Sequence, residues 1–282
     1  MARLAGIILM LLTMICPVNA ETLRVISLYP GHSDNISAMG GDEILVALSE
    51  NDDDDLLPDL PRIPLRSGAE RILALRPDVV ITRSFAERIN PNMYDVLRRS
   101  GVKVISLDPP SWDDFPEYLT TLADSLNLNS ITGITRLNNA IAGIKSPSAK
   151  SPRPRVFLEA TSRELHTCAP DSWPAKLIEL AGGVNIAGDA EPSRRGSTVA
   201  PYGVERVLRN AASIDVYIIQ TGAMNPATLN DFRNREWSSA LPNARVYEIP
   251  EKYISRPSLL GLEKAGEILH HIFSLEAKDN AR

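Results

Sequence analysis

The sequence contains few of the residues on which most enzymes depend. Among its 282 residues there are only two cysteines and four histidines, and aromatic residues make up 5% of the chain. It has no Gly-x-Ser-x-Gly elbow, no His-Glu-x-x-His or Cys-x-x-Cys motif and no glycine-rich phosphate loop. We therefore do not expect an enzyme, although two histidines in one cleft could still perform acid–base chemistry, as in a periplasmic chelatase or hydrolase.

An excess of basic residues is also lacking. The chain has 30 Lys and Arg residues against 35 Asp and Glu residues, which gives a net charge of −5 at pH 7. Nucleic acids and anionic membrane surfaces attract proteins with positively charged patches. The composition therefore argues against nucleic acid and against a membrane surface as partners.

The only long apolar run lies at the N-terminus. Arg3 precedes an apolar segment over residues 4–15, and Val18-Asn19-Ala20 matches the small-residue pattern that signal peptidase cleaves. About twelve apolar residues are too few to span a bilayer, which needs roughly twenty. A bulky Ile15 before Cys16 also argues against a lipoprotein signal. Residues 1–20 are predicted to be a signal peptide, and the mature chain is expected to be soluble and periplasmic.

Disulfides cannot stabilise the mature chain. After cleavage at Ala20, Cys168 is the only cysteine left, so no intrachain disulfide can form. Cys168 has two interpretations, a small buried hydrophobic side chain or a thiol that faces a ligand. The mature chain must be held together by burial of apolar surface.

Two stretches of the chain repeat one another. Residues 68–73 (Gly-Ala-Glu-Arg-Ile-Leu) precede the strand-like segment 78–82, and residues 203–208 (Gly-Val-Glu-Arg-Val-Leu) precede the strand-like segment 215–219. Each copy is typical of a short helix followed by a buried strand. The repeat predicts two similar α/β lobes, and clefts between lobes are common sites for small ligands.

Other segments alternate between strand-like and helix-like patterns. Further strands are expected at residues 23–28, 44–48, 102–107, 155–160 and 246–249, and the main helices at 115–126, 130–145, 172–180 and 257–273. Alternation at this spacing favours mainly parallel sheets. We predict an N-terminal α/β lobe over 21–111, a linking helical segment over 112–150 and a C-terminal α/β lobe over 151–282. The helix over 130–145 would be about 24 Å long, a stiff strut between the lobes.

A strongly acidic stretch follows the second expected strand. Residues 50–55 (Glu-Asn-Asp-Asp-Asp-Asp) precede Pro58, Pro61 and Pro64, and this composition predicts a surface loop. A site for a hard cation such as calcium is the alternative. The run lacks the alternate spacing and the turn-forming glycine of a calcium loop.

Three segments carry a resemblance to a known family. They are Arg24-Val-Ile-Ser-Leu-Tyr-Pro30, Glu70-Arg-Ile-Leu-Ala-Leu-Arg-Pro-Asp-Val-Val80 and Leu177-Ile-Glu-Leu-Ala-Gly-Gly-Val-Asn185. In these segments the chain resembles the periplasmic binding proteins of ABC importers for iron–siderophore complexes, haem and vitamin B12. The resemblance covers nearly all of the mature chain. It implies two Rossmann-like α/β lobes joined by one long rigid helix, with a small-molecule metal complex held between them.

The resemblance also implies how such a protein works. It would capture an iron chelate (siderophore or haem) or a corrinoid and deliver it to a membrane permease, with no intrinsic cofactor and no bond made or broken. In that family each lobe offers one surface glutamate to arginines of the permease, and the matching positions are Glu70 and Glu205. Two exposed carboxylates on related lobes can orient docking; a favourable helix-dipole contact is the alternative. We expect a monomer.

Ligand contacts are expected from loops at the carboxyl ends of the strands, where open α/β sheets bind ligands. The candidate residues are Tyr29, His32, Arg83 and Phe85 in the first lobe, and His166, Cys168, Trp173, Gln220, Tyr253 and Arg256 in the second. Aromatic rings can stack on a planar chelate, and arginines can pair with its carboxylates or with an anionic complex.

The identity of the ligand stays open at this point. His32 and His166 are candidates for axial ligands to a chelated metal, with an ordinary polar loop histidine as the alternative for each. Haem, a corrinoid, an Fe(III)-siderophore and an oxyanion such as molybdate all match this set of side chains. Bare zinc or manganese is a further alternative, but such sites need three histidines or two plus carboxylates, and His270 and His271 are adjacent on a helix.

Overall fold

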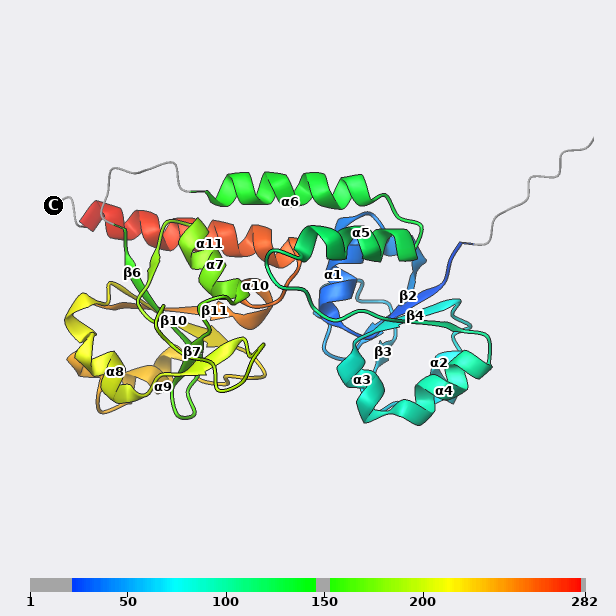
Figure 1. The fold of residues 1–282 in the computed structure, drawn as a ribbon, viewed down its shortest axis with the longest axis horizontal. Helices are drawn as coiled ribbons and strands as arrows, with labels where there is room; N and C mark the ends of the chain where they lie inside the picture. Colours follow the sequence, from blue (N-terminus) through cyan, green and yellow to red (C-terminus); the bar gives the residue numbers. More distant parts are fainter. Residues whose placement is uncertain (1–21, 146–152, 280–282) are drawn as a thin grey trace, which may run out of the picture.

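The computed structural model describes residues 22–145 and 153–279, with side chains through residue 274. The predicted signal peptide lies outside the described residues. Figure 1 shows two α/β lobes side by side. Three helices run along one edge of the molecule: α5 (Phe115–Ser125), α6 (Ser130–Ile144) and α11 (Leu259–Asp279).

The N-terminal lobe contains a five-stranded sheet in which every pair of strands is parallel. Its order is β3-β2-β1-β4-β5, formed by β1 (Val25–Ser27), β2 (Leu45–Ser49), β3 (Arg62–Ile63), β4 (Val79–Thr82) and β5 (Lys103–Ser106). All residues of β1 and β4 are buried, as expected for central strands covered on both faces. The strands predicted in this lobe are confirmed, and β3 is additional.

Helices cover both faces of this sheet, and the side chains of the strands alternate between them. The helices are α1 (Pro30–Ala38), the 3-10 turn η1 (Asp42–Ile44), α2 (Ala69–Leu73), α3 (Ser84–Ile89) and α4 (Pro91–Arg99). Ile26 and Val80 pack in an apolar cluster of their own lobe. Val25 and Ile81, on the opposite face, belong to a larger cluster that continues into the second lobe.

The C-terminal lobe contains a six-stranded sheet in the order β11-β10-β6-β7-β9, with β8 beside the start of β6. Its strands are β6 (Arg155–Thr161), β7 (His166–Cys168), β8 (Val184–Asn185), β9 (Val199–Pro201), β10 (Val216–Thr221) and β11 (Arg245–Pro250). Strand β7 pairs antiparallel with both β6 and β9. A loop was expected between the strand at 155–160 and the helix at 172–180, so the hairpin β6–β7 is a correction. A three-residue strand is too short to show a periodic pattern.

The helices of this lobe are short apart from the last one. They are α7 (Trp173–Leu180), α8 (Val204–Arg209), η2 (Ala211–Ser213), α9 (Leu229–Arg233), η3 (Ser238–Ala240) and α10 (Glu251–Ile254), followed by α11. The repeat seen in the sequence is confirmed, because α2 leads into β4 and α8 leads, through η2, into β10. The closing helix α11 extends six residues beyond the expected end at residue 273.

Helix α6 is the predicted strut, and it contacts both lobes. The side chain of Asn129 accepts a hydrogen bond from the Ile131 amide (3.0 Å) and so caps its first turn. Arg136 forms a bidentate ion pair with Glu263 of α11 (2.6 and 2.8 Å) and donates to the carbonyl of Ala38 at the end of α1 (3.1 Å). The Arg136 side chain therefore connects α6 both to the N-terminal lobe and to α11.

One apolar cluster runs through both lobes and the helices between them. It contains Val25 of β1, Leu119 of α5, Leu137 of α6, Val156 of β6 and Leu262 of α11, all of them buried. A shared core resists relative movement of the parts that form it, because separation would expose apolar surface to water.

The acidic stretch is more than the surface loop that was expected. Residues 62–63 form β3 at the sheet edge, and Asp52 is buried, with its carboxylate accepting a hydrogen bond from the Ser49 amide (2.8 Å). Asp53 pairs with Lys252 of α10, in the other lobe (3.1 Å). The prediction was wrong in this respect because charge patterning along the chain does not reveal a cationic partner two hundred residues away.

Candidate ligand cleft

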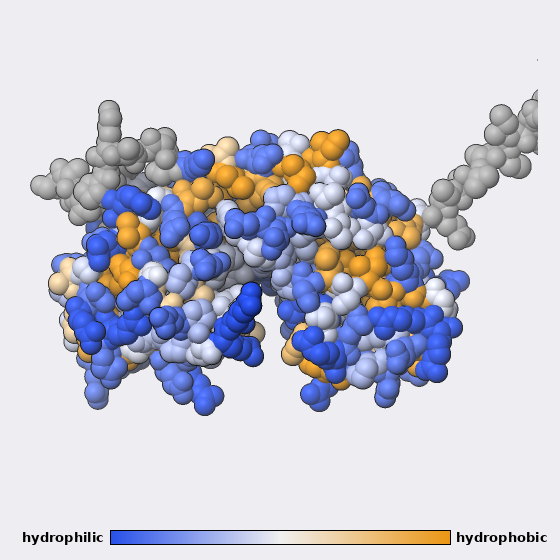
Figure 2. Space-filling model, viewed as in Figure 1, coloured by the Kyte–Doolittle hydropathy of each residue, from blue (hydrophilic) through white to orange (hydrophobic). Residues whose placement is uncertain are grey.

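Figure 2 shows a hollow between the two lobes that opens on the side away from α6. The carboxyl ends of the parallel strands lead to the boundary between the lobes. Tyr29 follows β1, Arg83 follows β4, and Arg256, which follows β11 and α10, pairs with Asp34 of the first lobe. The topology therefore places the predicted loops at this cleft.

Three of the predicted residues lie together on the first lobe. The guanidinium carbon of Arg83 is 4.3 Å from the ring centre of Tyr29 and 5.8 Å from that of Phe85. Phe85 is 48% exposed, and Tyr29 is half-buried. The Nε of Arg83 is buried and has no hydrogen-bond partner within the described residues. An arginine that packs against aromatic rings, and not against a carboxylate, can still pair with an acceptor on a ligand.

The start of α3 holds this group in place. The backbone amide and the hydroxyl of Ser84 both donate to the carboxylate of Asp108 (2.9 and 2.5 Å), which follows β5. Arg83 is the extended residue just before the helix. Two neighbouring strand ends thus set the direction in which Arg83 and Phe85 leave the sheet.

His32 does not reach the cleft. Its side chain is completely buried in α1, its Nδ1 lies 2.7 Å from the hydroxyl of Tyr118, and its Nε2 lies 3.2 Å from the carbonyl oxygen of Thr82. Burial lowers the pKa of His32 to about 4, opposed by the hydrogen bond to Thr82. Both ring nitrogens are engaged inside the lobe, so the structure argues against the axial-ligand role predicted for this histidine.

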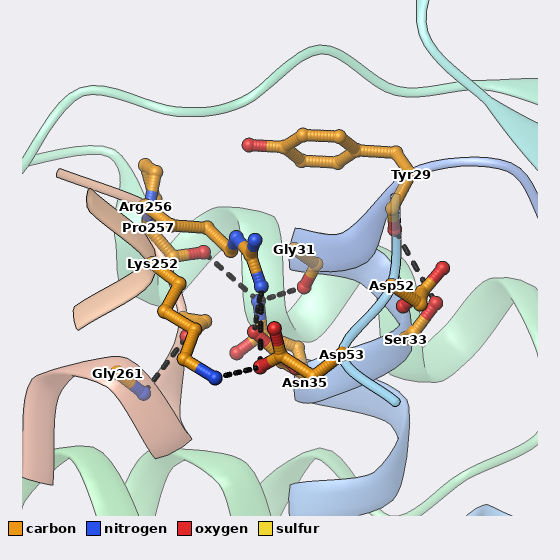
Figure 3. A network of polar contacts seen from close by, with 12 residues as sticks. Tyr29, Gly31, Ser33, Asn35, Asp52, Asp53, Lys252, Arg256, Pro257 and Gly261 are labelled. Carbon is orange, nitrogen blue, oxygen red and sulfur yellow. Dashed lines mark hydrogen bonds and ion pairs between the residues drawn. The ribbon is translucent and has the colours of Figure 1, made fainter. Parts of the chain in front are cut away.

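Arg256 connects the lobes across the base of the cleft. Its guanidinium lies 3.2 Å from the Asp34 carboxylate and 3.9 Å from that of Asp53, which also binds Lys252. Figure 3 shows Lys252 and Arg256 reaching from the second lobe toward Asp53 and Asn35 of the first. Carboxylates of the first lobe therefore balance the charge of Arg256, which was predicted to serve a ligand.

Hydrogen bonds between the Asn35 side chain and backbone groups of the second lobe reinforce this contact. The side-chain amide of Asn35 donates to the carbonyl of Pro257 (3.1 Å), and its oxygen accepts from the amide of Leu259 (2.9 Å) at the start of α11.

Burial raises the pKa of Asp34 against the effect of Arg256, and burial raises the pKa of Asp52 to about 7. Sequence reasoning missed Asp34, Asn35 and Lys252, since nothing in their local sequence marks a contact between lobes.

The residues predicted in the second lobe divide into two groups. Cys168, Trp173 and Gln220 are at least 95% buried, and burial raises the pKa of the Cys168 thiol to about 11. This matches the interpretation of Cys168 as a small buried side chain. His166 and Tyr253 are half-buried. Nδ1 of His166 lies 3.0 Å from the carbonyl oxygen of Arg163, and its Nε2 has no partner within the described part of the chain.

Trp173 packs against the linking segment instead of the cleft loops. Its ring centre lies 4.6 Å from that of Trp112 and 4.9 Å from that of Phe115. Gln220 accepts a short hydrogen bond from the hydroxyl of Ser255. Both residues therefore support the region around the cleft from inside.

A charged group that the sequence did not reveal lies inside the second lobe. The Glu159 carboxylate, completely buried in β6, accepts two hydrogen bonds from Arg235 (2.6 and 2.9 Å), one from the hydroxyl of Tyr217 (2.6 Å) and one from Asn225 (3.3 Å). A buried carboxylate requires such partners. A glutamate in an apolar strand was a signal that could have pointed to it.

The comparisons with known proteins agree with this geometry. A family model described as "Periplasmic binding protein" matches residues 25–253. This chain belongs to the periplasmic binding protein family.

Individual members of the family span the same length. This binding protein is 24% identical over 273 residues to the vitamin B12-binding protein of Vibrio parahaemolyticus, covering 92% of this chain and 93% of the relative. Its fold matches a solved structure described as a possible iron-binding (periplasmic solute-binding) protein from Staphylococcus epidermidis, with a TM-score of 0.70 and 18% identity. The match covers 86% of this chain and 97% of the other. It also matches the apo form of a periplasmic haem-binding protein from Roseiflexus sp. RS-1, with a TM-score of 0.63 and 20% identity. That match covers 89% of this chain and 98% of the other.

In this binding protein Glu70 and Glu205 occupy equivalent places. Each is exposed and lies in the first turn of its helix, α2 or α8. Figure 1 shows these helices in different lobes, on the side of the molecule away from α6.

Within the described residues, no helix has the length and apolar character needed to cross a membrane. The same residues contain no group of three or more His, Cys, Asp or Glu side chains arranged to hold a metal ion.

Proposed function

We propose that this periplasmic binding protein is the receptor of an ABC importer. It captures a corrinoid, haem or another iron chelate in the cleft and delivers it, unchanged, to a membrane permease. It works in the periplasm after removal of residues 1–20. The group of Tyr29, Arg83 and Phe85 carries the proposal, because it combines aromatic surface with a guanidinium that packs against aromatic rings and has no carboxylate partner within the described residues.

This chemistry suits large, partly planar metal complexes. Aromatic rings cover the flat face of a macrocycle, and arginine donates paired hydrogen bonds to a carboxylate or a phosphate. His166 and Tyr253, both half-buried on the facing lobe, supply further polar contacts, with Nε2 of His166 available as an axial ligand. The names of the relatives, for vitamin B12, haem and iron, support this range of ligands.

We further propose that Glu70 and Glu205 dock the loaded protein onto the permease. Both are exposed, both start a short helix, and one lies on each lobe. Two negative charges at a fixed separation suit a partner with two basic patches.

Titration of the mature protein tests the proposal. Cyanocobalamin, haemin and a ferric siderophore are added in turn and followed by visible absorption. We expect saturable binding of one of them, and Arg83→Gln is expected to weaken that binding about tenfold or more, because a charge-assisted hydrogen bond contributes about 1.5–3 kcal/mol. Arg99→Gln, on the exposed surface of α4 away from this group, is the control.

The proposal fails if none of the three probes binds while the protein binds zinc tightly or turns over a substrate.

A further inference from the structure

A pocket of about 300 Å³ lies beside Glu205 on the second lobe. It is formed by the turn between β6 and β7, the start of α8 and the segment after α9. Ligand pockets typically occupy about 300–1,000 Å³, so this one is at the small end of the range. It suits a single side chain better than a metal chelate.

The pocket is negatively charged. Glu164 and Glu205 line it, both are exposed, and neither has an ion-pair partner in the part of the chain that the structure describes. Arg235 also lines it, but the buried Glu159 carboxylate binds that guanidinium through two hydrogen bonds. The buried pair contributes no net charge, and two carboxylates remain.

An aromatic wall completes the pocket. Trp237 is half-buried and lines the cavity together with these glutamates. The guanidinium carbon of Arg235 lies 5.4 Å from its ring centre, which fixes the orientation of the indole. An indole ring beside two carboxylates is a favourable environment for a cation, and for a planar guanidinium above all.

The turn that carries Glu164 is tied to the helix that carries Glu205. The Leu165 carbonyl accepts hydrogen bonds from the amides of Tyr202 (3.2 Å) and Gly203 (3.0 Å). Gly203 has a φ of 82°, which glycine adopts without strain. The backbone segments that carry the two carboxylates are therefore joined by hydrogen bonds.

The first lobe has no equivalent of this turn. Its first strand, β1, leads directly into α1, whereas β6 leads into the antiparallel strand β7 through the turn that carries Glu164. The repeat that relates Glu70 to Glu205 thus does not extend to Glu164.

We propose that this pocket receives an arginine side chain of the permease, with its guanidinium between Glu164 and Glu205 and against Trp237. The inference rests on the proposed function and adds to it a second carboxylate and an aromatic contact on one lobe only. Docking is then unequal on the two lobes, and the second lobe carries the more specific contact.

Arginine amide is the probe, and citrulline amide is its control, because it keeps the same shape and α-ammonium group but has a neutral urea in place of the guanidinium. The mature protein is labelled with ¹⁵N at its three tryptophans, and the Trp237 indole resonance is assigned with Trp237→Phe. We expect arginine amide to shift this resonance saturably, and citrulline amide to leave it unchanged. Glu164→Gln is expected to weaken the binding about two- to fivefold, the range for a solvent-exposed ion pair. Glu179→Gln, on the exposed face of α7, is the control.

An equal response to both amides, or an unchanged affinity in Glu164→Gln, overturns the inference. Cyanocobalamin and haemin are titrated into the same samples, so that binding of a chelate is measured separately from binding of arginine amide. If the protein binds a chelate but not arginine amide, only the proposed arginine site is disproved. If it binds no chelate, the proposed function is contradicted, whether or not arginine amide binds.

Discussion

At the scale of single residues, burial decided the role of several polar side chains. His32 and Cys168 follow or form strand ends where ligands are expected, yet both are completely buried. Arg83 and Phe85, predicted by the same reasoning, keep part of their surface exposed beside a strand end. Sequence spacing places a residue at the end of a strand, but the packing of the next helix decides whether its side chain turns inward.

Asp52 leads to a prediction on pH dependence. Burial raises its pKa to about 7 in the folded protein, against about 3.9 in an unfolded chain. The folded state therefore binds the proton more tightly, and the carboxyl destabilises the fold increasingly as the pH rises from about 4 to 7. Asp52→Asn keeps a side-chain oxygen that can accept the hydrogen bond from the Ser49 amide. We expect it to raise the free energy of unfolding at pH 8 by on the order of a few kcal/mol.

Urea unfolding of both proteins at pH 8 and at pH 4 checks this. The gain at pH 8 should disappear at pH 4, where Asp52 is protonated in the folded protein. A gain of the same size at both values would show that the charge of Asp52 is not its cause.

At the scale of elements, close packing of α6 on α11 fixes the strut. Gly266 of α11 faces Ile144 so closely that a Cβ atom there would overlap the isoleucine side chain. Gly143, the residue before Ile144, has open space around its Cα. The same residue type therefore has opposite roles at two nearby positions.

A pair of alanine substitutions tests this difference. Gly143→Ala is expected to stabilise the protein by up to about 1 kcal/mol, since alanine favours the helix over glycine. Gly266→Ala makes the same gain in propensity but forces Ile144 out of its place, and overpacking costs about 1–3 kcal/mol. We expect it to lower the midpoint of thermal unfolding. Stabilisation by both variants would show that the helices can move apart without loss.

At the scale of the whole molecule, the shared core and the ion pairs at the base of the cleft hold the lobes. Arg256 and Asp34 are both largely buried, whereas Lys252 and Asp53 are each about 30% exposed at their side chains. Exposed pairs contribute roughly 0–1 kcal/mol, and removal of one partner of a buried pair costs about 3–5 kcal/mol. The contact between the lobes should therefore depend mainly on Arg256 and Asp34.

A double-mutant cycle measures this contact. We expect Arg256→Gln to destabilise the protein more than Lys252→Gln, because it leaves the Asp34 carboxylate buried without its partner. Adding Asp34→Asn should restore part of the loss, which gives a coupling energy between the two residues. Additive effects of the two substitutions in urea unfolding would contradict a direct interaction between the lobes at this position.

The sequence by itself determined the two α/β lobes, the order of their main strands, the helix between them and the loops that meet at the cleft. Apolar periodicity and turn residues act over a few positions, so a linear pattern contains them. Only the tertiary structure decided that Arg256 binds Asp34, that the acidic stretch contacts α10, that Glu159 neutralises Arg235 and that Glu164 stands beside Glu205. These pairs join residues far apart in the chain, and their charges interact only after the fold has excluded water and brought them within a few ångströms.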